Sequence, residues 1–240
     1  FGKQAYIVMD REKTMADLLC KRAESLGGHF NIMSGNDVLP IIDKETLLIV
    51  TDVHRPSFLD APEVYNHCKN IVVIDHHRKA VDFINDAVIF YHETAVSSAC
   101  EMVTEMLQYM APKSVGQLEA EALLSGIMLD TRNFILRAGV RTFEAAAYLR
   151  QLGADTVEVK KLLQNDFQDT MAKYQIIKSA RLYRQEIAIV PLNTGTTRVL
   201  AAQAADELLN ISGISASFVL YPDEDRVLIS ARSIGEANVQ

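Results

Sequence analysis

Short runs of apolar, often β-branched residues alternate with amphipathic segments in the first part of the chain. An apolar run bounded by polar residues is typical of a strand buried on both faces, and a helical spacing of apolar residues is typical of a surface helix. Strands that alternate with helices predict βαβ units and a mostly parallel sheet. The expected strands are 5–10, 46–52, 71–74 and 87–91, and the expected helices are 14–26 and 60–67.

The pattern becomes helical after residue 94 and changes again near residue 183. Beyond that point the polar turn 223–225 separates two apolar runs and predicts an antiparallel hairpin. Ser114 is the expected N-cap of the second helix in this part. The expected helices are 96–110, 115–130, 141–152, 156–163, 167–183 and 199–209, and the expected later strands are 186–191, 214–221 and 226–231.

This order of elements predicts an α/β fold in two parts. The first is a mostly parallel sheet flanked by helices, and the second is a smaller α/β domain with an antiparallel hairpin. A chain of 240 residues is long enough for two such domains. We place the boundary at a linker helix, giving expected domains of 1–178 and 179–240.

Composition narrows the class of protein without assigning a function. About half of the residues are apolar, and no apolar run approaches the roughly 20 residues of a membrane span. The three cysteines are widely spaced, which favours reduced thiols and a cytoplasmic setting. The net charge of −7 argues against a long nucleic-acid groove, but it leaves room for a small phosphorylated ligand.

The strand expected at 71–74 ends in four consecutive polar residues, Asp75, His76, His77 and Arg78. Ligands of open α/β sheets bind beyond the carboxyl ends of the strands, so we expect chemistry at this point. The alternative is that Asp75 caps a helix and that the histidines are ordinary surface groups.

Two further carboxylates occupy comparable positions. Asp52 follows the strand 46–52, and Asp130 lies at the end of an expected helix. If the strands before Asp52 and His76 are neighbours, their ends lie about 5 Å apart, and the two side chains could ligate the same ion together with Asp130. Carboxylates with one imidazole and no thiolate suit Mn²⁺ or Mg²⁺ better than structural zinc. Turn or cap chemistry is the alternative for each carboxylate taken alone.

Candidate phosphate-binding residues surround this centre. Arginines and a histidine can hold a phosphate by charge or hydrogen bonds, and a serine at a helix start adds free backbone N–H groups. Serines at such positions are more often simple caps, so they carry less weight than the arginines. The candidates are His54, Arg55, Ser57, Arg78, Ser97, Ser98 and Arg141.

The same residues form three motifs that resemble one family. They are Asp75-His76-His77, the segment Asp52 to Ser57 and the segment Asp130 to Phe134. In this order they resemble the DHH phosphoesterase superfamily, which includes RecJ. The Thr-Asp-Val-His-Arg-Pro-Ser form and the segment 139–145 are similar to the GdpP (YybT) type of cyclic-di-AMP phosphodiesterase. The resemblance covers nearly the whole chain, and the trailing domain is similar to the DHH-associated C-terminal domain.

The resemblance implies a Mn²⁺-dependent hydrolase that opens cyclic di-AMP, a bacterial signalling nucleotide, to linear pApA and that also cleaves other dinucleotides. It implies that Asp52 bridges two manganese ions, while His76 and Asp130 complete the shell of one of them. His77 and Arg78 would face the phosphate, and Asp75 would orient a histidine. The metal ions would activate water, so no side-chain nucleophile is needed. The resemblance also implies a membrane-anchored complete protein whose catalytic part is cytoplasmic. A homodimer formed through the helical part is a separate expectation.

The sequence departs from the family pattern in two ways that change the expected metal binding and activity. The chain lacks a His-x-x-x-Asp-x-Asp motif, which residues 9–12 do not match, and it lacks a C-terminal Gly-Gly-Gly-His segment. We therefore expect a piece of a longer protein in which the first metal site is lost and the second is weakened. The alternative is a catalytically impaired fragment that acts as a nucleotide-binding or dimerisation module. An exonuclease of the RecJ kind is disfavoured by the acidic charge.

Overall fold

The computed structural model describes residues 3–10, 16–26, 30–111, 114–234 and 239. Contacts divide the chain into two compact units, Phe1–Gln164 and Asn165–Gln240. This boundary precedes helix α8 (Phe167–Lys178), whereas the sequence pattern placed it after that helix, because α8 packs against α9 (Arg198–Leu208). Within the described residues, no helix combines the length and the apolar character that crossing a bilayer requires.

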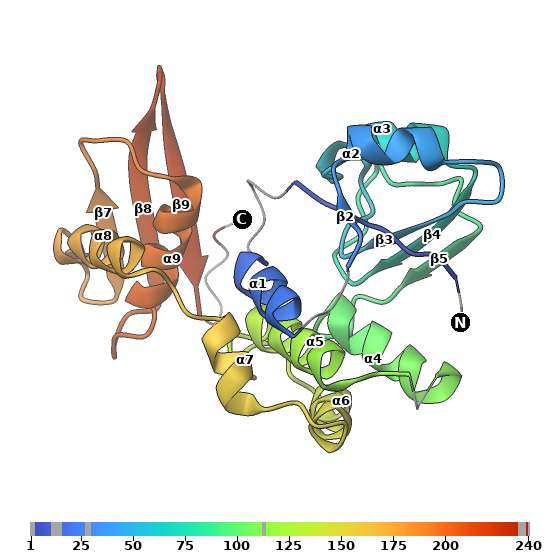
Figure 1. Ribbon diagram of the computed structural model, residues 1–240. Coiled ribbons are helices and arrows are strands. Elements are labelled where there is room, and N and C mark those ends of the chain that lie inside the picture. The colour runs from blue at the N-terminus through green and yellow to red at the C-terminus, as the bar shows by residue number, and fades with distance from the viewer. Residues whose placement is uncertain (1–2, 11–15, 27–29, 112–113, 235–238, 240) are drawn as a thin grey trace. The chain divides into compact units, whose positions relative to one another are not determined.

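The first unit contains two separate parallel sheets (Figure 1). β1 pairs with β2, and β3, β4 and β5 form the second sheet in that order. The parallel arrangement confirms the prediction, but β2 was not predicted because two apolar residues show no periodicity. The strands are β1 (Ile7–Val8), β2 (Ile32–Met33), β3 (Leu47–Thr51), β4 (Asn70–Asp75) and β5 (Ile89–His92). The helices are α1 (Asp17–Ser25), α2 (Gly35–Val38), α3 (Pro62–His67), α4 (Ala99–Met110), α5 (Gln117–Asp130), α6 (Val140–Gln151) and α7 (Thr156–Leu162).

Helices pack on both faces of the three-stranded sheet, but they leave Ile49 of β3 and Ile89 of β5 more than half exposed. On one face, α2 and α3 pack their residues Val38 and Val64 against Val73 of β4. On the other face, α4 packs Met102 against Ile74. Side chains of alternating strand residues point to opposite faces, so neighbouring apolar positions in β4 serve the two cores.

A third core in this unit lies among α5, α6 and α7 and is built from buried residues such as Ile127, Leu149 and Val159. α5 begins at Gln117 with Gly116 as its N-cap, and Glu119 accepts a hydrogen bond from the Gly116 amide. The prediction that Ser114 is the N-cap of this helix is therefore wrong. The Ser114 hydroxyl instead donates to the carbonyl of Ala111, the residue after α4, over 2.8 Å.

Helices α4 and α5 approach closely at Gly126, where an added Cβ would lie 3.2 Å from the Cβ of Cys100 and closer still to its sulfur. We expect Gly126→Ala to lower the free energy of unfolding of this unit by about 2 kcal/mol, because overpacking outweighs the gain of about 1 kcal/mol in helix propensity. The measurement is amide hydrogen exchange in α5, which reports on this unit.

The control is the same substitution in a Cys100→Ala background, where the sulfur is absent. Gly126→Ala should cost clearly less in that background. An equal cost in both backgrounds would show that the close contact with Cys100 is not the cause.

The second unit has one four-stranded sheet in the order β6-β7-β8-β9. β7 and β8 are parallel, and the remaining pairs are antiparallel. The pairing of β8 with β9 confirms the predicted hairpin. The helix predicted over 167–183 is too long, because the chain leaves α8 at Lys178 and residues 181–183 pair with β7. The strands are β6 (Arg181–Tyr183), β7 (Ile187–Pro191), β8 (Ala216–Asp223) and β9 (Arg226–Ser233).

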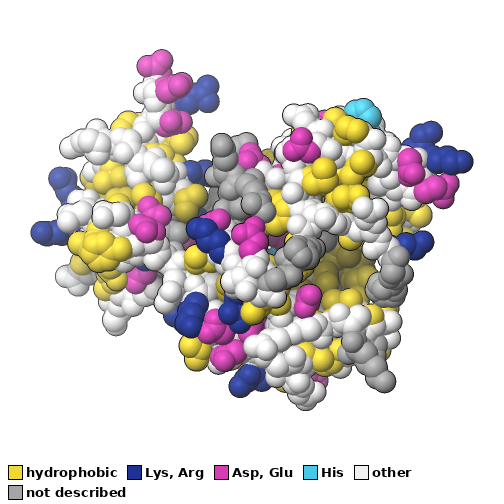
Figure 2. Space-filling model, viewed as in Figure 1, with side chains coloured by type: hydrophobic (Ala, Val, Ile, Leu, Met, Phe, Trp, Pro, Cys, Tyr) yellow, Lys and Arg dark blue, Asp and Glu magenta, His cyan; other side chains and the backbone are white. Residues whose placement is uncertain are grey.

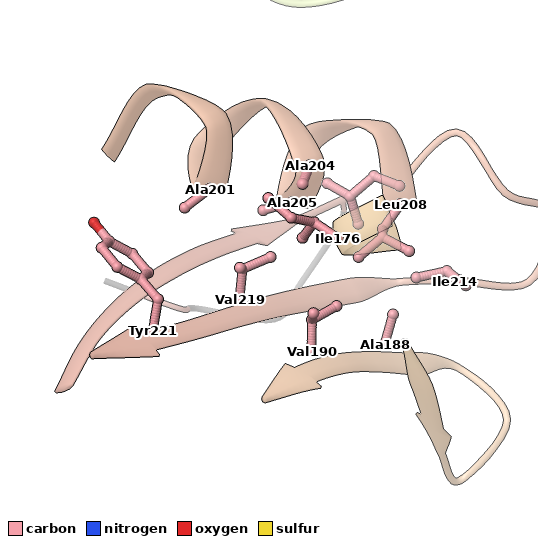
Figure 3. Packing of buried hydrophobic residues seen from close by; sticks show 11 residues of the cluster. Ile176, Ala188, Val190, Ala201, Ala204, Ala205, Leu208, Ile214, Val219 and Tyr221 are labelled. Carbon is pink, nitrogen blue, oxygen red and sulfur yellow. The ribbon is translucent and has the colours of Figure 1, made fainter. Parts of the chain in front are cut away.

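The core of this unit lies between α9 and the sheet, as Figure 3 shows. α9 directs three fully buried alanines, Ala201, Ala204 and Ala205, toward the strands. Val190 of β7 and Val219 of β8 face them. Small side chains on α9 allow the helix to lie close to the sheet, so the helix and the sheet enclose a closely packed core. Both units together confirm the predicted α/β fold class.

Apolar side chains also reach the surface of both units, as the yellow atoms in Figure 2 show. In the first unit, Ile135, Val140 and Phe143 follow the candidate site residue Asp130 and are each more than half exposed. Scattered apolar side chains are normal on protein surfaces. They therefore assign no function by themselves.

Candidate metal centre

The register of the three-stranded sheet brings polar residues of two strands to one edge. Thr51 of β3 is opposite Ile74 of β4. Asp52, the residue after β3, is therefore next to the end of β4, whose last residue is Asp75. The amide of Asp52 donates to the carbonyl of Ile74 over 2.9 Å. Asp52 has a φ of 64°, a left-handed conformation that aspartate adopts more readily than most residues. The chain thus turns sharply after β3 while Asp52 stays beside β4.

His76 is the central side chain of this edge and is only 5% exposed. Its Nδ1 lies 3.4 Å from the carbonyl oxygen of Val96, an acceptor, so the hydrogen belongs on Nδ1. Nε2 then carries a lone pair, which points toward Asp52 Oδ1 at 3.3 Å and Asp130 Oδ2 at 3.7 Å. Among the residues that the structure describes, Nε2 is the single buried side-chain nitrogen or oxygen without a hydrogen-bond partner.

The charges at this point are incompletely balanced. The neighbouring Asp52 carboxylate is the main cause that raises the pKa of His76, against the lowering effect of burial. Burial, followed by repulsion from Asp52, raises the pKa of Asp130. Two carboxylates and one imidazole therefore all favour an additional positive charge among them.

A divalent cation fits this arrangement. Ligand atoms about 2.1 Å from a six-coordinate ion lie roughly 3 Å apart, close to the distances from His76 Nε2 to the two carboxylate oxygens. Such an ion would also satisfy the unpartnered Nε2. The nearby Cys100 is no competing thiolate ligand, because burial and the acidic neighbours raise its pKa to about 12. The donor set is then oxygen and imidazole nitrogen, which suits Mg²⁺ and Mn²⁺. We call Asp52, His76 and Asp130 the candidate cation site.

His77 is an alternative third ligand. Asp52, His76 and His77 each offer one ligand atom, and these atoms lie within 4.8 Å of one another. However, Nδ1 of His77 lies 2.8 Å from Asp75 Oδ1 and 3.8 Å from Asp52 Oδ1, so it is already engaged in the shorter contact. Asp130, whose side chain is one-third exposed, is the better third ligand on this geometry.

Asp75 is fully buried and serves two histidines at once. Its Oδ1 accepts from the amide of His77 at 3.0 Å and from the ring of the same residue at 2.8 Å, while its Oδ2 accepts from the ring of His54. Burial alone would raise the pKa of the Asp75 carboxyl, but these hydrogen bonds outweigh it and hold the pKa below its ordinary value. Asp75 is therefore an anion that orients the surrounding imidazoles.

A left-handed turn positions Asp130 at the end of α5. Three consecutive residues, 132–134, have φ between 48° and 65°. The hydroxyl of Thr131 donates to the carbonyl of Ile127 over 2.6 Å and accepts from the amide of Phe134 over 2.9 Å. The ring of Phe134 stacks on Phe143 at a centroid distance of 5.3 Å. The segment from Asp130 to Phe134 is thus a compact helix end that fixes where the carboxylate lies.

Comparison with known proteins identifies the family of the chain. The model of the DHH family, N-terminal domain, matches residues 7–127. The chain belongs to the DHH family. The match contains β3, β4 and the Asp-His-His segment that ends β4.

Longer DHH proteins resemble nearly all of this chain. It is 40% identical over 247 residues to the cyclic-di-AMP phosphodiesterase PdeA of Listeria monocytogenes, an alignment that covers 99% of this chain and 37% of that protein. It is 41% identical over 250 residues to the cyclic-di-AMP phosphodiesterase GdpP of Bacillus subtilis, covering 100% of this chain and 38% of that protein. The chain therefore spans less than two-fifths of the length of these relatives.

A solved structure supports the fold. The crystal structure of an exopolyphosphatase-related protein from Bacteroides fragilis superposes with a TM-score of 0.73 at 18% sequence identity. The superposition covers 91% of this chain and 67% of that chain. This likeness concerns the α/β architecture.

The predicted phosphate-binding arginines of this DHH chain differ in their surroundings. Arg55 donates two hydrogen bonds to Asp82, and Arg78 lies exposed directly after the two histidines. Arg141 is held between two carboxylates, at 2.6 Å from Glu93 and from Glu105. Arg55 and Arg141 are thus engaged in ion pairs, and the phosphate-binding roles of all three arginines remain predictions.

The predicted serines lie in two environments. Ser57 is exposed in the 3-10 turn Pro56–Phe58. Ser97 and Ser98 are buried at the start of α4, where Ser98 accepts from the amide of Glu101 at 3.0 Å and Ser97 donates to the Glu101 carboxylate. These two hydroxyls are thus engaged in capping the helix, and their assignment to substrate remains a prediction.

Three contributors to the site were not recognised in the sequence. The carbonyl of Val96 sets the tautomer of His76, and a backbone acceptor leaves no side-chain signal. Glu101 is buried, and its position three residues after Ser98 is a capping-box spacing that could have indicated it. His92 has no acidic partner at a useful spacing in the sequence, but its Nε2 lies 2.6 Å from the carbonyl oxygen of His77.

Proposed function

We propose that this chain is the catalytic module of a cyclic-dinucleotide phosphodiesterase that hydrolyses cyclic di-AMP to linear pApA. The observation that carries the proposal is the convergence of Asp52, His76 and Asp130 around one unpartnered imidazole nitrogen at the sheet edge. The relatives from Listeria and Bacillus are cyclic-di-AMP phosphodiesterases, which supports the choice of substrate. Other cyclic or linear dinucleotides share the same reacting group and are included as further substrates.

Each residue of the site has a role in this proposal. Asp52, His76 and Asp130 hold the divalent cation, and the cation would activate water and neutralise phosphate charge when bound. Arg78 binds the anionic phosphate. His77, oriented by Asp75, presents its remaining ring nitrogen to the substrate. The resemblance of the sequence motifs favours Mn²⁺ over Mg²⁺. It implies two ions for the family, and Asp52, His76 and Asp130 are proposed to hold one of them.

The second unit completes the proposal for the whole protein. We assign it as the DHH-associated C-terminal domain, which the sequence resemblance implies after the linker helix. The same resemblance supports a cytoplasmic module of a membrane-anchored protein, and a homodimer is proposed separately. Fractionation of cells that express the complete protein, followed by its mass in detergent, tests both points.

The experiment is to titrate the metal-free chain with Mn²⁺ by calorimetry and then to measure conversion of cyclic di-AMP to pApA by chromatography. We expect saturable Mn²⁺ binding and turnover that stops when a chelator is added. The matched control replaces Mn²⁺ with Ca²⁺, whose larger and more flexible coordination sphere is expected to support less turnover.

The outcomes distinguish the enzyme from a binding module. Turnover that depends on the cation supports the proposal. Binding of cyclic di-AMP without any product at saturating Mn²⁺ would overturn it in favour of a nucleotide-binding module.

A further inference from the structure

His54 is a buried histidine whose two ring nitrogens are both used inside the protein. It follows β3 by a short loop and is 3% exposed. Nδ1 contacts Oδ2 of Asp75, and Nε2 lies 2.9 Å from the amide nitrogen of Ala80. The His54 carbonyl accepts from the amide of Ile84 over 2.8 Å. The residue therefore joins the end of β3, the end of β4 and the loop that follows the histidine pair.

These contacts define which ring nitrogen of His54 carries the hydrogen. A backbone N–H can only donate, so the contact with Ala80 requires a lone pair on Nε2. The hydrogen of a neutral His54 ring must then lie on Nδ1, where it is donated to Asp75. Each nitrogen thus has one role, and neither is left for substrate.

The same reasoning extends through Asp75 to His77. With Oδ2 occupied by His54, the Oδ1 atom of Asp75 faces the amide and Nδ1 of His77. A carboxylate accepts hydrogen bonds, so the hydrogen of a neutral His77 ring belongs on Nδ1. Nε2 of His77 is consequently a free acceptor on a side chain that is 55% exposed.

We propose that His54 is a positioning residue that acts through Asp75 to fix the orientation and tautomer of His77 for the substrate phosphate. This differs from the substrate-binding role that the sequence motif suggested for His54. The kinetic part of the inference rests on the proposed function, whereas the tautomer of His77 is a property of the metal-free chain.

Burial alone would not select a histidine at this position. An apolar residue would fill the space beside Phe90 and His92, whose rings lie 6.4 and 5.5 Å from that of His54. It would, however, leave Oδ2 of Asp75 buried without a donor. The donor on Nδ1 is therefore the feature that matters for His77, and the acceptor on Nε2 is the feature that holds the 78–80 loop.

Two substitutions separate these features. In His54→Asn the amide nitrogen lies near the former Nδ1 position and keeps the donor to Asp75, while the acceptor for Ala80 is lost. In His54→Gln the amide reaches the former Nε2 position and keeps a partner for Ala80, while the donor to Asp75 is lost. The pair is matched in polarity, so a difference between them reports on the bond to Asp75.

The first measurement is ¹⁵N NMR of the imidazole rings in the metal-free chain, with His77 assigned by comparison with His77→Asn. We expect the Nδ1–H tautomer of His77 in the unmodified chain and in His54→Asn, and a mixture of tautomers in His54→Gln. The second measurement is turnover of cyclic di-AMP with Mn²⁺. We expect kcat to fall about 10-fold or more in His54→Gln and about 3-fold or less in His54→Asn, with KM nearly unchanged, as is typical when a partner of a functional histidine is lost.

The outcomes are separable from those of the proposed function. An Nε2–H tautomer of His77 in the unmodified chain would overturn the inference without any variant, even if a variant failed to fold. Equal kcat values for the Asn and Gln variants would also overturn it. A chain that shows no turnover of cyclic di-AMP would count against the proposed function alone, because the NMR result still decides the role of His54.

Discussion

Asp52→Asn is expected to reduce the affinity of the chain for Mn²⁺ by more than about 100-fold. Loss of a partner outside the ligand set typically costs about 10–100-fold in metal affinity, and Asp52 would be a charged ligand beside His76. Asparagine adopts the left-handed backbone of residue 52 as readily as aspartate, so the turn after β3 is preserved. Calorimetric titration of the metal-free variant measures the effect.

The metal-free variant should remain folded and be at least as stable as the unmodified chain. Asp52 repels Asp130 and raises its pKa, so removing the charge of Asp52 moves the pKa of Asp130 back toward its ordinary value. Asp60→Asn, at an exposed carboxylate of the same unit, is the control and should bind Mn²⁺ normally. Undiminished affinity in Asp52→Asn would remove this residue from the candidate cation site.

Glu121→Ala is expected to destabilise the first unit by about 3 kcal/mol or more. Glu121 is fully buried in α5, and its carboxylate accepts from Arg22 of α1 at 2.7 Å and from Gln117 at 2.9 Å. The amide of Asp155, the N-cap of α7, lies 3.4 Å away. Removing one partner of a buried ion pair typically costs about 3–5 kcal/mol. Arg22 keeps its second ion pair, with Glu158 at 2.7 Å, so we expect the lower end of this range.

Hydrogen exchange of α5 amides measures this effect within the first unit. Glu121→Gln keeps the shape and one acceptor and should cost less than the alanine variant. Glu144→Ala, at an exposed glutamate of α6, is the matched control and should change stability by less than about 0.5 kcal/mol. A loss below about 1 kcal/mol for Glu121→Ala would mean that this network does not join the three helices energetically.

The strands and the acidic ends of the first unit were predictable because they depend on local pattern. The apolar run 71–74 and the residues after it required a buried strand with polar groups at its carboxyl end, and β4 ends at Asp75. Asp52 could be placed beside His76 because parallel neighbours bring their ends to one edge. Asp130 was a candidate because its carboxylate lies at a helix end, but no local pattern brings a helix end to a sheet edge, and the family motif implied that it joins the other two.

The remaining features depend on contacts between distant segments. β2 consists of two residues and exists because β1 pairs with it, so no period could reveal it. The boundary between the units follows the packing of α8 on α9, which the sequence around residue 178 does not express. His54 could be recognised as a polar residue near the site. The orientation of its ring, however, depends on a hydrogen bond to Asp75, which lies 21 residues later in the chain.

The contact between His76 and the Val96 carbonyl has a consequence for how this region can vary. The acceptor is a main-chain atom, so the hydrogen bond depends on the position of the backbone at residue 96. It does not depend on which side chain residue 96 carries. Thr94 and Ala95, exposed between β5 and α4, should accept many replacements. Insertion or deletion of a single residue between His92 and Ser98 would shift the carbonyl away from the ring. The exposed positions of this connection are therefore tolerant of exchange, whereas its length is fixed.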